Sequence, residues 1–407
     1  MEITEFLQTS YTPYHAVQNG IAMLKEHGFV PFDPAQDVAT VGGRYYVTLA
    51  DSTLIALVLG DTPCPMLAIS HTDSPCLKVR GTVDSPLGKR LDVESYGGLL
   101  KRSMLDIPCR VAGRVVCASE GGVYSQIVTS DFAVIIPSLC IHHGGDSIEL
   151  KVQNDMMPLL GGCDLYQALG IRDKVLDADL YVVPDVVPFA AGAQNEFLCA
   201  PRIDNLTSVY TSLKALCEAN PKGVAVCACF DNEETGSRTR QSAGGDLLCR
   251  VLASAMQPYG CTMQAACSRG LALSIDNGHS VHPAHPERSA PNGQVLMNGG
   301  VVIKHNPNYA TDALSGGMFK YILQQAALPY QDFHNHADVR CGGTLGLMSA
   351  RQLLIPTCDI GLAQLAMHAA VETVGAKDVD IMQRALTAFF NALIYPNEAG
   401  YCRIETR

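Results

Sequence analysis

Residues 224–237 read VAVCACFDNEETGS and contain the pattern that decides the fold. The first seven residues form an unbroken apolar run, which is typical of a strand buried on both faces of a sheet. Acidic and amide side chains follow directly, and Thr235-Gly236-Ser237 then marks a loop. In open α/β sheets ligands bind at the carboxyl ends of the strands. The stretch therefore predicts a buried strand that ends at a polar site.

The segments downstream of this stretch alternate between helical and strand patterns. Apolar residues recur with a helical period in 206–216, 247–252 and 382–393, and residues 271–275 form another short apolar run. Such alternation predicts an α/β layer with a central mixed, largely parallel sheet flanked by helices.

The amino-terminal segment has the same character. Residues 14–28 carry apolar positions at helical spacing, and Gly28 is placed to end that helix. Strand-like runs follow at 45–49, 54–59 and 66–69. We assign this segment to the same α/β unit.

Residues 76–200 have a different residue pattern. Short strand patterns such as 111–117 and 132–136 are broken by Gly and Pro, with little helical periodicity. We therefore expect a β-rich domain of residues 76–200, inserted into an α/β domain made of residues 1–75 and 201–407.

Composition excludes several classes of protein. Hydrophobic residues make up 47% of the 407 residues, and the net charge of −11 argues against nucleic acid or an anionic membrane as a partner. No uncharged apolar run is long enough for a membrane helix, and the first residues lack signal-peptide regions. The sixteen cysteines form no CxxC pairs, which favours free thiols over disulfides. We expect a cytoplasmic protein.

Acidic and histidine residues follow several predicted strands. His71 and Asp73 come after the run at 66–69, and Asp276 comes after 271–275. Because strand ends can converge at one sheet edge, these side chains are candidates for one site.

Two further positions have alternative interpretations. The adjacent Glu233 and Glu234 would repel each other unless a cation compensates them, and the alternative is a solvated charge run. Asp204 precedes the helical pattern at 206–216, where it could be a helix N-cap.

Five motifs in a fixed order resemble one known family. They are His71-Thr72-Asp73, Pro201-Arg202-Ile203-Asp204-Asn205, residues 231–237, Ser274-Ile275-Asp276 and Gln364-Leu365-Ala366-Met367-His368. This order closely resembles the aspartyl aminopeptidase family, which includes vacuolar aminopeptidase I, and the resemblance covers most of the chain. It implies a metal-dependent aminopeptidase that removes the N-terminal residue of short peptides.

The resemblance also implies a role for each matched position. Asp204 would bridge two metals, with His71 and Asp276 completing one site and Glu234 and His368 the other. Glu233 would be the general base, and Asp73 would support His71. Histidine and carboxylate ligands suit two divalent ions, for which zinc is expected and cobalt or manganese are alternatives.

Family members use the β-rich insertion to form dimers that assemble into a tetrahedral dodecamer. The resemblance places His142 in the substrate pocket of a neighbouring subunit, and the alternative is a surface histidine on a strand. The sequence departs from the family near Tyr96-Gly97-Gly98-Leu99, where the usual aromatic-Asp-Arg element is missing, and it has no Trp. This departure concerns subunit contacts and pocket shape.

Substrate preference rests on one basic residue. By resemblance, Lys304 would bind an acidic (Asp or Glu) N-terminal side chain, and the alternative is a solvated lysine. A Leu-like neutral preference, a related deacylase or carboxypeptidase, and a non-catalytic scaffold are the competing functions. The last would be expected to have lost a ligand or the base.

Four residues near these motifs have no assigned role. Glu372 follows His368 by four residues, so on a helix it could orient that histidine, or it could lie on the surface. His279, His282 and His285 could be imagined as a metal-binding tract, but loop shaping is favoured.

Overall fold

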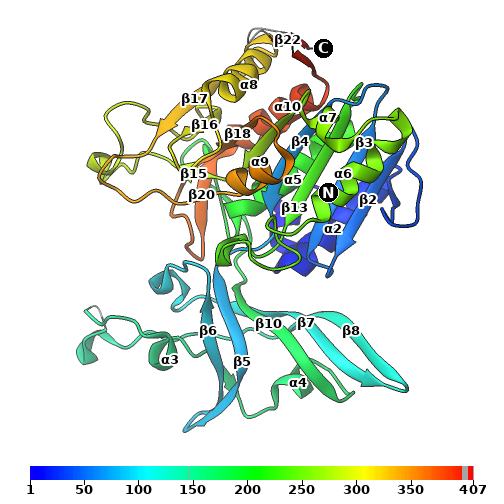
Figure 1. Cartoon of the computed structure of the whole chain (residues 1–407). Helices are drawn as coiled ribbons and strands as arrows, with labels where there is room; N and C mark the ends of the chain where they lie inside the picture. Colours follow the sequence, from blue (N-terminus) through cyan, green and yellow to red (C-terminus); the bar gives the residue numbers. More distant parts are fainter. Residues whose placement is uncertain (146, 397–401, 407) are drawn as a thin grey trace.

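The computed structural model of the chain describes residues 1–145, 147–396 and 402–406. Two lobes are visible, a large α/β lobe above and a lobe built on a twisted sheet below (Figure 1). The three predicted strands near the amino terminus and the helix before them are present, and each lies in the large lobe.

A nine-stranded mixed sheet forms the centre of the large lobe. Its strands, in spatial order, are β1 (Val30–Pro31), β2 (Arg44–Leu49), β3 (Thr53–Leu59), β13 (Val224–Phe230), β4 (Pro65–His71), β14 (Leu271–Ile275), β18 (Thr357–Gly361), β16 (Val301–His305) and β17 (Tyr330–His334). The four central strands from β13 to β18 are mutually parallel, while β2, β3 and β16 join by antiparallel pairings. The predicted mixed, largely parallel sheet is confirmed.

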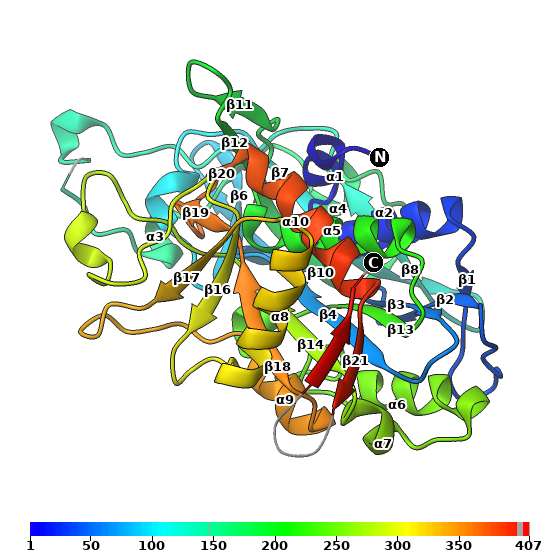
Figure 2. The same cartoon turned by 90° about the horizontal axis from the view of Figure 1, so that it is seen from above.

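Helices cover both faces of this sheet (Figure 2). One face packs against α1 (Ile3–Thr9), α2 (Pro13–Glu26), α5 (Ile203–Glu218), α8 (Ala313–Gln325) and α10 (Ala376–Phe390). The other packs against α6 (Leu247–Ala255), α7 (Met263–Cys267) and α9 (Gly346–Leu353).

The apolar run at 224–230 explains why both faces are covered. Successive side chains of a strand point to opposite faces. Ala225 and Cys227 accordingly join the core beneath α5, whereas Val226 and Ala228 join the core beneath α6. All are fully buried, and burying a side chain as large as Val contributes about 1.5 kcal/mol or more.

The lower lobe is an antiparallel sheet with a core of its own. Its strands are β8 (Gly122–Thr129), β7 (Cys109–Ser119), β10 (Val175–Pro184), β5 (Cys76–Ser85), β6 (Gly88–Tyr96) and β9 (Leu159–Gly161), with the short helices α3 (Val152–Asp155) and α4 (Leu165–Ala168). The predicted domain limits at residues 75/76 and 200/201 stay predictions.

A third sheet lies where the chain returns to the large lobe. It contains β11 (Phe189–Ala191), β12 (Phe197–Ala200), β20 (Glu372–Gly375), β19 (Ala363–Leu365) and β15 (Gly278–His279). A terminal hairpin pairs β21 (Leu393–Pro396) with β22 (Cys402–Glu405). The third sheet positions the site, because β12 leads into α5 and β20 pairs with β12.

Two predicted elements are wrong in detail. The predicted strand at 132–136 is replaced by two isolated bridges, Val134 to Cys109 and Ile135 to Leu159. Neighbouring residues therefore pair with different partners, and no continuous ladder forms. The predicted helix at 382–393 ends at Phe390, and Leu393 begins β21 instead.

All sixteen cysteines lie in the described residues and are free thiols, as predicted, and most are buried. Among the described helices, none combines the length and the apolar character that a membrane crossing requires.

Candidate metal centre

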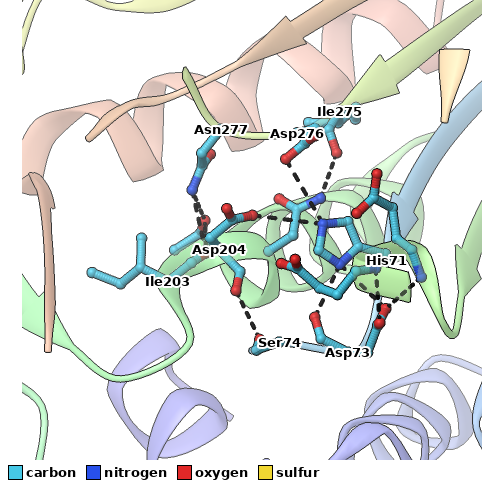
Figure 3. Close-up of polar contacts among 12 residues, drawn as sticks. His71, Asp73, Ser74, Ile203, Asp204, Ile275, Asp276 and Asn277 are labelled. Carbon is cyan, nitrogen blue, oxygen red and sulfur yellow. Dashed lines mark hydrogen bonds and ion pairs between the residues drawn. The ribbon is translucent and has the colours of Figure 1, made fainter. Parts of the chain in front are cut away.

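Three neighbouring strands of the central sheet end at the same edge. The parallel pairing of β13 with β4 sets Phe230 opposite His71, and the pairing of β4 with β14 sets Ile69 opposite Ser274. The residues that follow these positions therefore meet, as predicted. Figure 3 shows the imidazole of His71 between the carboxylates of Asp73, Asp204 and Asp276.

Two histidines face one shared carboxylate. His71 Nε2 lies 3.6 Å from Asp204 Oδ1 and 3.8 Å from Asp276 Oδ1. On the other side, His368 Nε2 lies 3.5 Å from Asp204 Oδ2 and 3.4 Å from Glu234 Oε1. The structure thus brings together two groups that share Asp204, and a third group of His71, Glu233 and Glu234 overlaps both.

Asp204 lies at the start of α5 and is not a helix cap. Its backbone angles are non-helical, and its buried Oδ1 accepts no hydrogen bond. Its backbone is held instead, because the N–H donates to Glu372 Oε2 at 2.8 Å and the carbonyl accepts from Ser74 Oγ at 2.7 Å. The N-cap interpretation is wrong, and the carboxylate is free to face the histidines.

A buried guanidinium fixes the turn that precedes α5. Arg202 donates to the carbonyl oxygens of Pro184 and Leu7, at 3.1 and 3.0 Å. These partners lie at the end of β10 in the lower lobe and in α1. The start of α5 is therefore anchored to both lobes.

Glu233 and Glu234 lie in a single 3₁₀ turn (Glu233–Thr235) directly after β13. Their backbone N–H groups donate to the two oxygens of Asp73, at 3.0 and 3.1 Å. Asp73 also accepts from the hydroxyl of Tyr96 at 2.7 Å. The side chain of Glu234 is only 6% exposed, so a solvated charge run is excluded for it.

His368 lies in the loop between β19 and β20, in the left-handed region with φ of 65°. Its Nδ1 pairs with the carbonyl of Gly98 at 3.0 Å, which leaves Nε2 for the site. Its N–H donates to Glu372 Oε1 at 2.6 Å. Glu372 is buried on strand β20 rather than exposed on a helix, so the helical expectation is wrong, although its contact with His368 is real.

The pKa values of the acids in the centre shift in opposite directions, depending on whether burial with nearby carboxylates or the two histidines dominate. Burial, with repulsion from Asp276 and Asp73, raises the pKa of Glu233 to about 7. Burial and the nearby Asp204 raise the pKa of Glu234 well above its usual value. Asp204 is different, because His368 and His71 outweigh burial and hold its pKa below the usual range.

The two histidines respond to the same carboxylates. Burial alone would lower the pKa of His71, but Asp204 and Asp276 outweigh it and hold that pKa well above the usual value. For His368 burial is likewise outweighed by Asp204 and Glu234, and its pKa rises to about 10. The centre is thus an acidic cluster that attracts positive charge.

The donor atoms fit metal ions better than hydrogen bonds. The four separations of 3.4–3.8 Å between histidine nitrogens and carboxylate oxygens are long for hydrogen bonds. Two ligands at about 2.0–2.1 Å from a tetrahedral zinc ion lie roughly 3.3–3.4 Å apart. The buried, unpartnered Oδ1 of Asp204 also requires a cation or donor. The residues present therefore fit divalent metal ions.

A cavity of about 440 Å³ opens beside this centre. Lys304 and His279 line it together with the predicted ligands. Lys304 is only 2% exposed and donates to Asn277 O at 2.8 Å, so the solvated alternative is wrong. His142 does not line the cavity, and it lies exposed on a 3₁₀ turn (Ile141–His143) rather than on a strand.

His282 and His285 lie apart from the cavity. Both are exposed, and their rings lie 5.3 Å apart. Of the three histidines that follow Asp276, His279 alone is a lining residue of the described cavity.

Several contributors carry no sequence signal of their own. Tyr96 reaches the site from the lower lobe through hydrogen bonds to Asp73 and from Asn232, and Gly98 through one to His368. Asn277 holds Lys304 through its carbonyl oxygen. Tyr309 lies with its ring centroid 5.4 Å from the Lys304 nitrogen. The sequence offers three hints: Asn277 is adjacent to Asp276, a glycine turn follows Tyr96, and Tyr309-Ala310-Thr311 resembles a segment of the family.

Histidines and carboxylates that converge in a cavity at the carboxyl ends of sheet strands are typical of a metalloenzyme. The chain belongs to the family described as aminopeptidase I zinc metalloprotease (M18), which matches residues 6–164 and 164–390. It is therefore an aminopeptidase of a zinc metallopeptidase family.

Individual relatives agree with this family. A probable M18 family aminopeptidase 2 of Ectopseudomonas mendocina is 34% identical, over 96% of this chain and 97% of the relative. The solved complex of Ape4 and Nbr1 is 27% identical with a TM-score of 0.89, over 95% of this chain and 84% of that chain. The mApe1 dodecamer of S. cerevisiae is 23% identical with a TM-score of 0.82, over 95% of both chains.

Proposed function

We propose that the centre holds two divalent metal ions, which share Asp204, and hydrolyses the N-terminal peptide bond of short peptides. The observation that carries this proposal is that the two oxygens of Asp204 face different histidines, His71 at 3.6 Å and His368 at 3.5 Å. Asp276 would complete one site and Glu234 the other. Zinc is the expected metal, with cobalt or manganese as alternatives.

Metal ions bound here would polarise the scissile carbonyl and lower the pKa of a bound water. Glu233 would act as the general base, taking the proton from that water and returning it to the leaving amine. The Glu233 backbone is held by Asp73, which keeps the carboxylate beside the ligands. His71 Nδ1 lies 2.9 Å from the carbonyl of Asp73, an arrangement that leaves Nε2 for the metal.

Lys304 supports a preference for acidic N-terminal side chains. It is a buried cation in the cavity, and its hydrogen bond to Asn277 uses one of three donors. An acidic substrate side chain would otherwise be repelled by the carboxylates of the centre. The lining residues Tyr309 and Phe333 favour the alternative, a neutral Leu-like side chain.

Assembly is the second part of the proposal. The chain would form dimers through residues 76–200 and a dodecamer from these dimers, with His142 reaching a neighbouring cavity. Exposed apolar side chains near His142 support this, since Leu139 is 44% and Ile141 70% exposed. The likeness in fold to a dodecameric relative adds support. A cytoplasmic location stays a prediction.

The test is a substrate panel on metal-depleted protein reloaded with zinc, cobalt or manganese. Aminoacyl substrates of Asp, Glu, Leu, Ala and Lys are compared with an N-acyl amino acid, and the Lys304→Met variant is assayed in parallel. We expect metal-dependent cleavage of Asp and Glu substrates that Lys304→Met reduces selectively. Activity that survives exhaustive chelation would refute the metal mechanism, and faster cleavage of Leu would replace the acidic preference with the neutral one.

A further inference from the structure

Two loops line the side of the cavity away from the metal ligands. Residues 306–312 carry Tyr309, and residues 335–345 carry Gly342 and Gly343. The thiol of Cys341 donates to the Tyr309 hydroxyl at 3.3 Å, so the two loops touch at the cavity. Neither loop is part of a helix or strand, so other contacts must hold their shape.

One buried carboxylate behind the cavity ties both loops. Asp359, fully buried on β18, accepts from the backbone N–H of Ala310 at 2.6 Å through Oδ2. Through Oδ1 it accepts from the hydroxyl of Thr344 at 2.5 Å. Its own N–H donates to Thr311 Oγ1 at 2.7 Å, which adds a second bond to the first loop.

Asp359 packs closely against the start of α9. A Cβ on residue 346 would lie 2.5 Å from Asp359 Oδ1, so Gly346 permits the close approach of the second loop. Asp359 does not line the cavity and makes none of the described contacts with the metal-site residues. Its carboxylate therefore contacts both loops, and its charge also lies near Lys304.

We propose that Asp359 is a positioning residue for substrate binding, which holds the Tyr309 loop and the Gly342–Gly343 loop against each other. This inference rests on the proposed aminopeptidase function. It predicts that loosening either bond weakens substrate binding and leaves the metal ligands in place.

The test compares variants that break or keep one bond. Thr344→Val removes the hydroxyl at nearly constant shape, Thr344→Ser keeps it, and Thr357→Val removes a buried hydroxyl of β18 that bonds only the carbonyl of Ile355. For Thr344→Val we expect KM to rise about 10- to 150-fold, the scale of one hydrogen bond to a charged group. We expect kcat to change less than about threefold and metal content to stay unchanged.

Thr344→Ser and Thr357→Val should keep a KM near that of the wild type. Unchanged KM in Thr344→Val would overturn the inference, as would a fall in metal content or in kcat alone. A lower unfolding temperature with unchanged kinetics would also overturn it, since the tie would then be merely structural. These results require an active wild type, whereas a wild type without peptidase activity would instead refute the proposed function.

Discussion

The two sides of the metal centre are built on different scaffolds. On one side, His71 ends β4 and Asp276 directly follows the adjacent parallel strand β14. On the other, Glu234 lies in a turn and His368 in a loop, and the His368 side chain is 29% exposed against 1% for His71. We refer to these as the strand side and the loop side.

The loop side needs supports that the strand side receives from the sheet. Asp73 accepts from the N–H groups of Glu233 and Glu234, and Glu372 accepts from those of Asp204 and His368. Each of these two carboxylates thus fixes the backbone of two residues of the site that lie close together in space. Where no strand positions a metal ligand, a buried carboxylate positions it through hydrogen bonds to the backbone.

The largest expected effect concerns Glu233, which we assign as the general base and count with neither the strand side nor the loop side. Glu233→Gln should lower kcat about 100- to 10,000-fold, because general-base removal typically has this effect. Metal content, measured by elemental analysis, should equal that of the wild type. The exposed Glu26→Gln serves as a control. Turnover near the wild-type value would contradict the assignment.

The next effect separates the two sides by stability. In the metal-free protein, His71→Ala should cost about 3 kcal/mol, because it leaves buried carboxylates unpaired. His368→Ala also leaves Asp204 and Glu234 unpaired, but it should cost only about 1–2 kcal/mol, because the 29% exposed His368 side chain lets solvent screen part of the interaction. Thermal unfolding at neutral pH measures both. Equal losses, or a larger loss for His368→Ala, would remove the distinction between the sides.

A smaller effect is expected when a support of the loop side is weakened. Glu372→Gln keeps only one oxygen to accept from the N–H groups of Asp204 and His368. Metal affinity should fall about 10- to 100-fold, the usual result of losing a partner that orients ligands. Competition with a chelator measures it, and unchanged affinity would show that Glu372 has no such role.

The smallest effect concerns the contact from the lower lobe to Asp73. Tyr96→Phe removes the hydroxyl that donates to Asp73 at 2.7 Å and accepts from Asn232 Nδ2 at 2.8 Å. We expect kcat/KM to fall by only about 3- to 10-fold, because Asp73 keeps its hydrogen bonds to the backbone of Glu233 and Glu234. A drop as large as that of Glu233→Gln would mean that Tyr96 takes part in the chemistry.

The strand side could be predicted from residue patterns alone. Apolar runs before His71 and Asp276 predict strands, and parallel strand ends converge wherever the fold is an α/β sheet. The run at 224–230 is long and bounded on both sides, so its strand is predicted with correct limits.

The loop side could not be derived in this way. The helical pattern after Asp204 suggested a helix N-cap rather than a ligand, and no pattern marks His368. Their place in the site followed from the family resemblance. Glu372 was expected on a helix because a spacing of four residues is compatible with one. Pairing of residues 372–375 with β12 is a tertiary contact that no local pattern records. The burial of Lys304 depends on packing in the same way.

The most direct test of the shared ligand is the metal content of the wild type and of Asp204→Asn. Both proteins are purified in zinc, dialysed and analysed for metal per subunit, with folding checked by circular dichroism. The account predicts two zinc ions per subunit in the wild type and loss of both in the folded variant, since each side needs one oxygen of Asp204. A single ion in the wild type, or two ions retained by the variant, would contradict it.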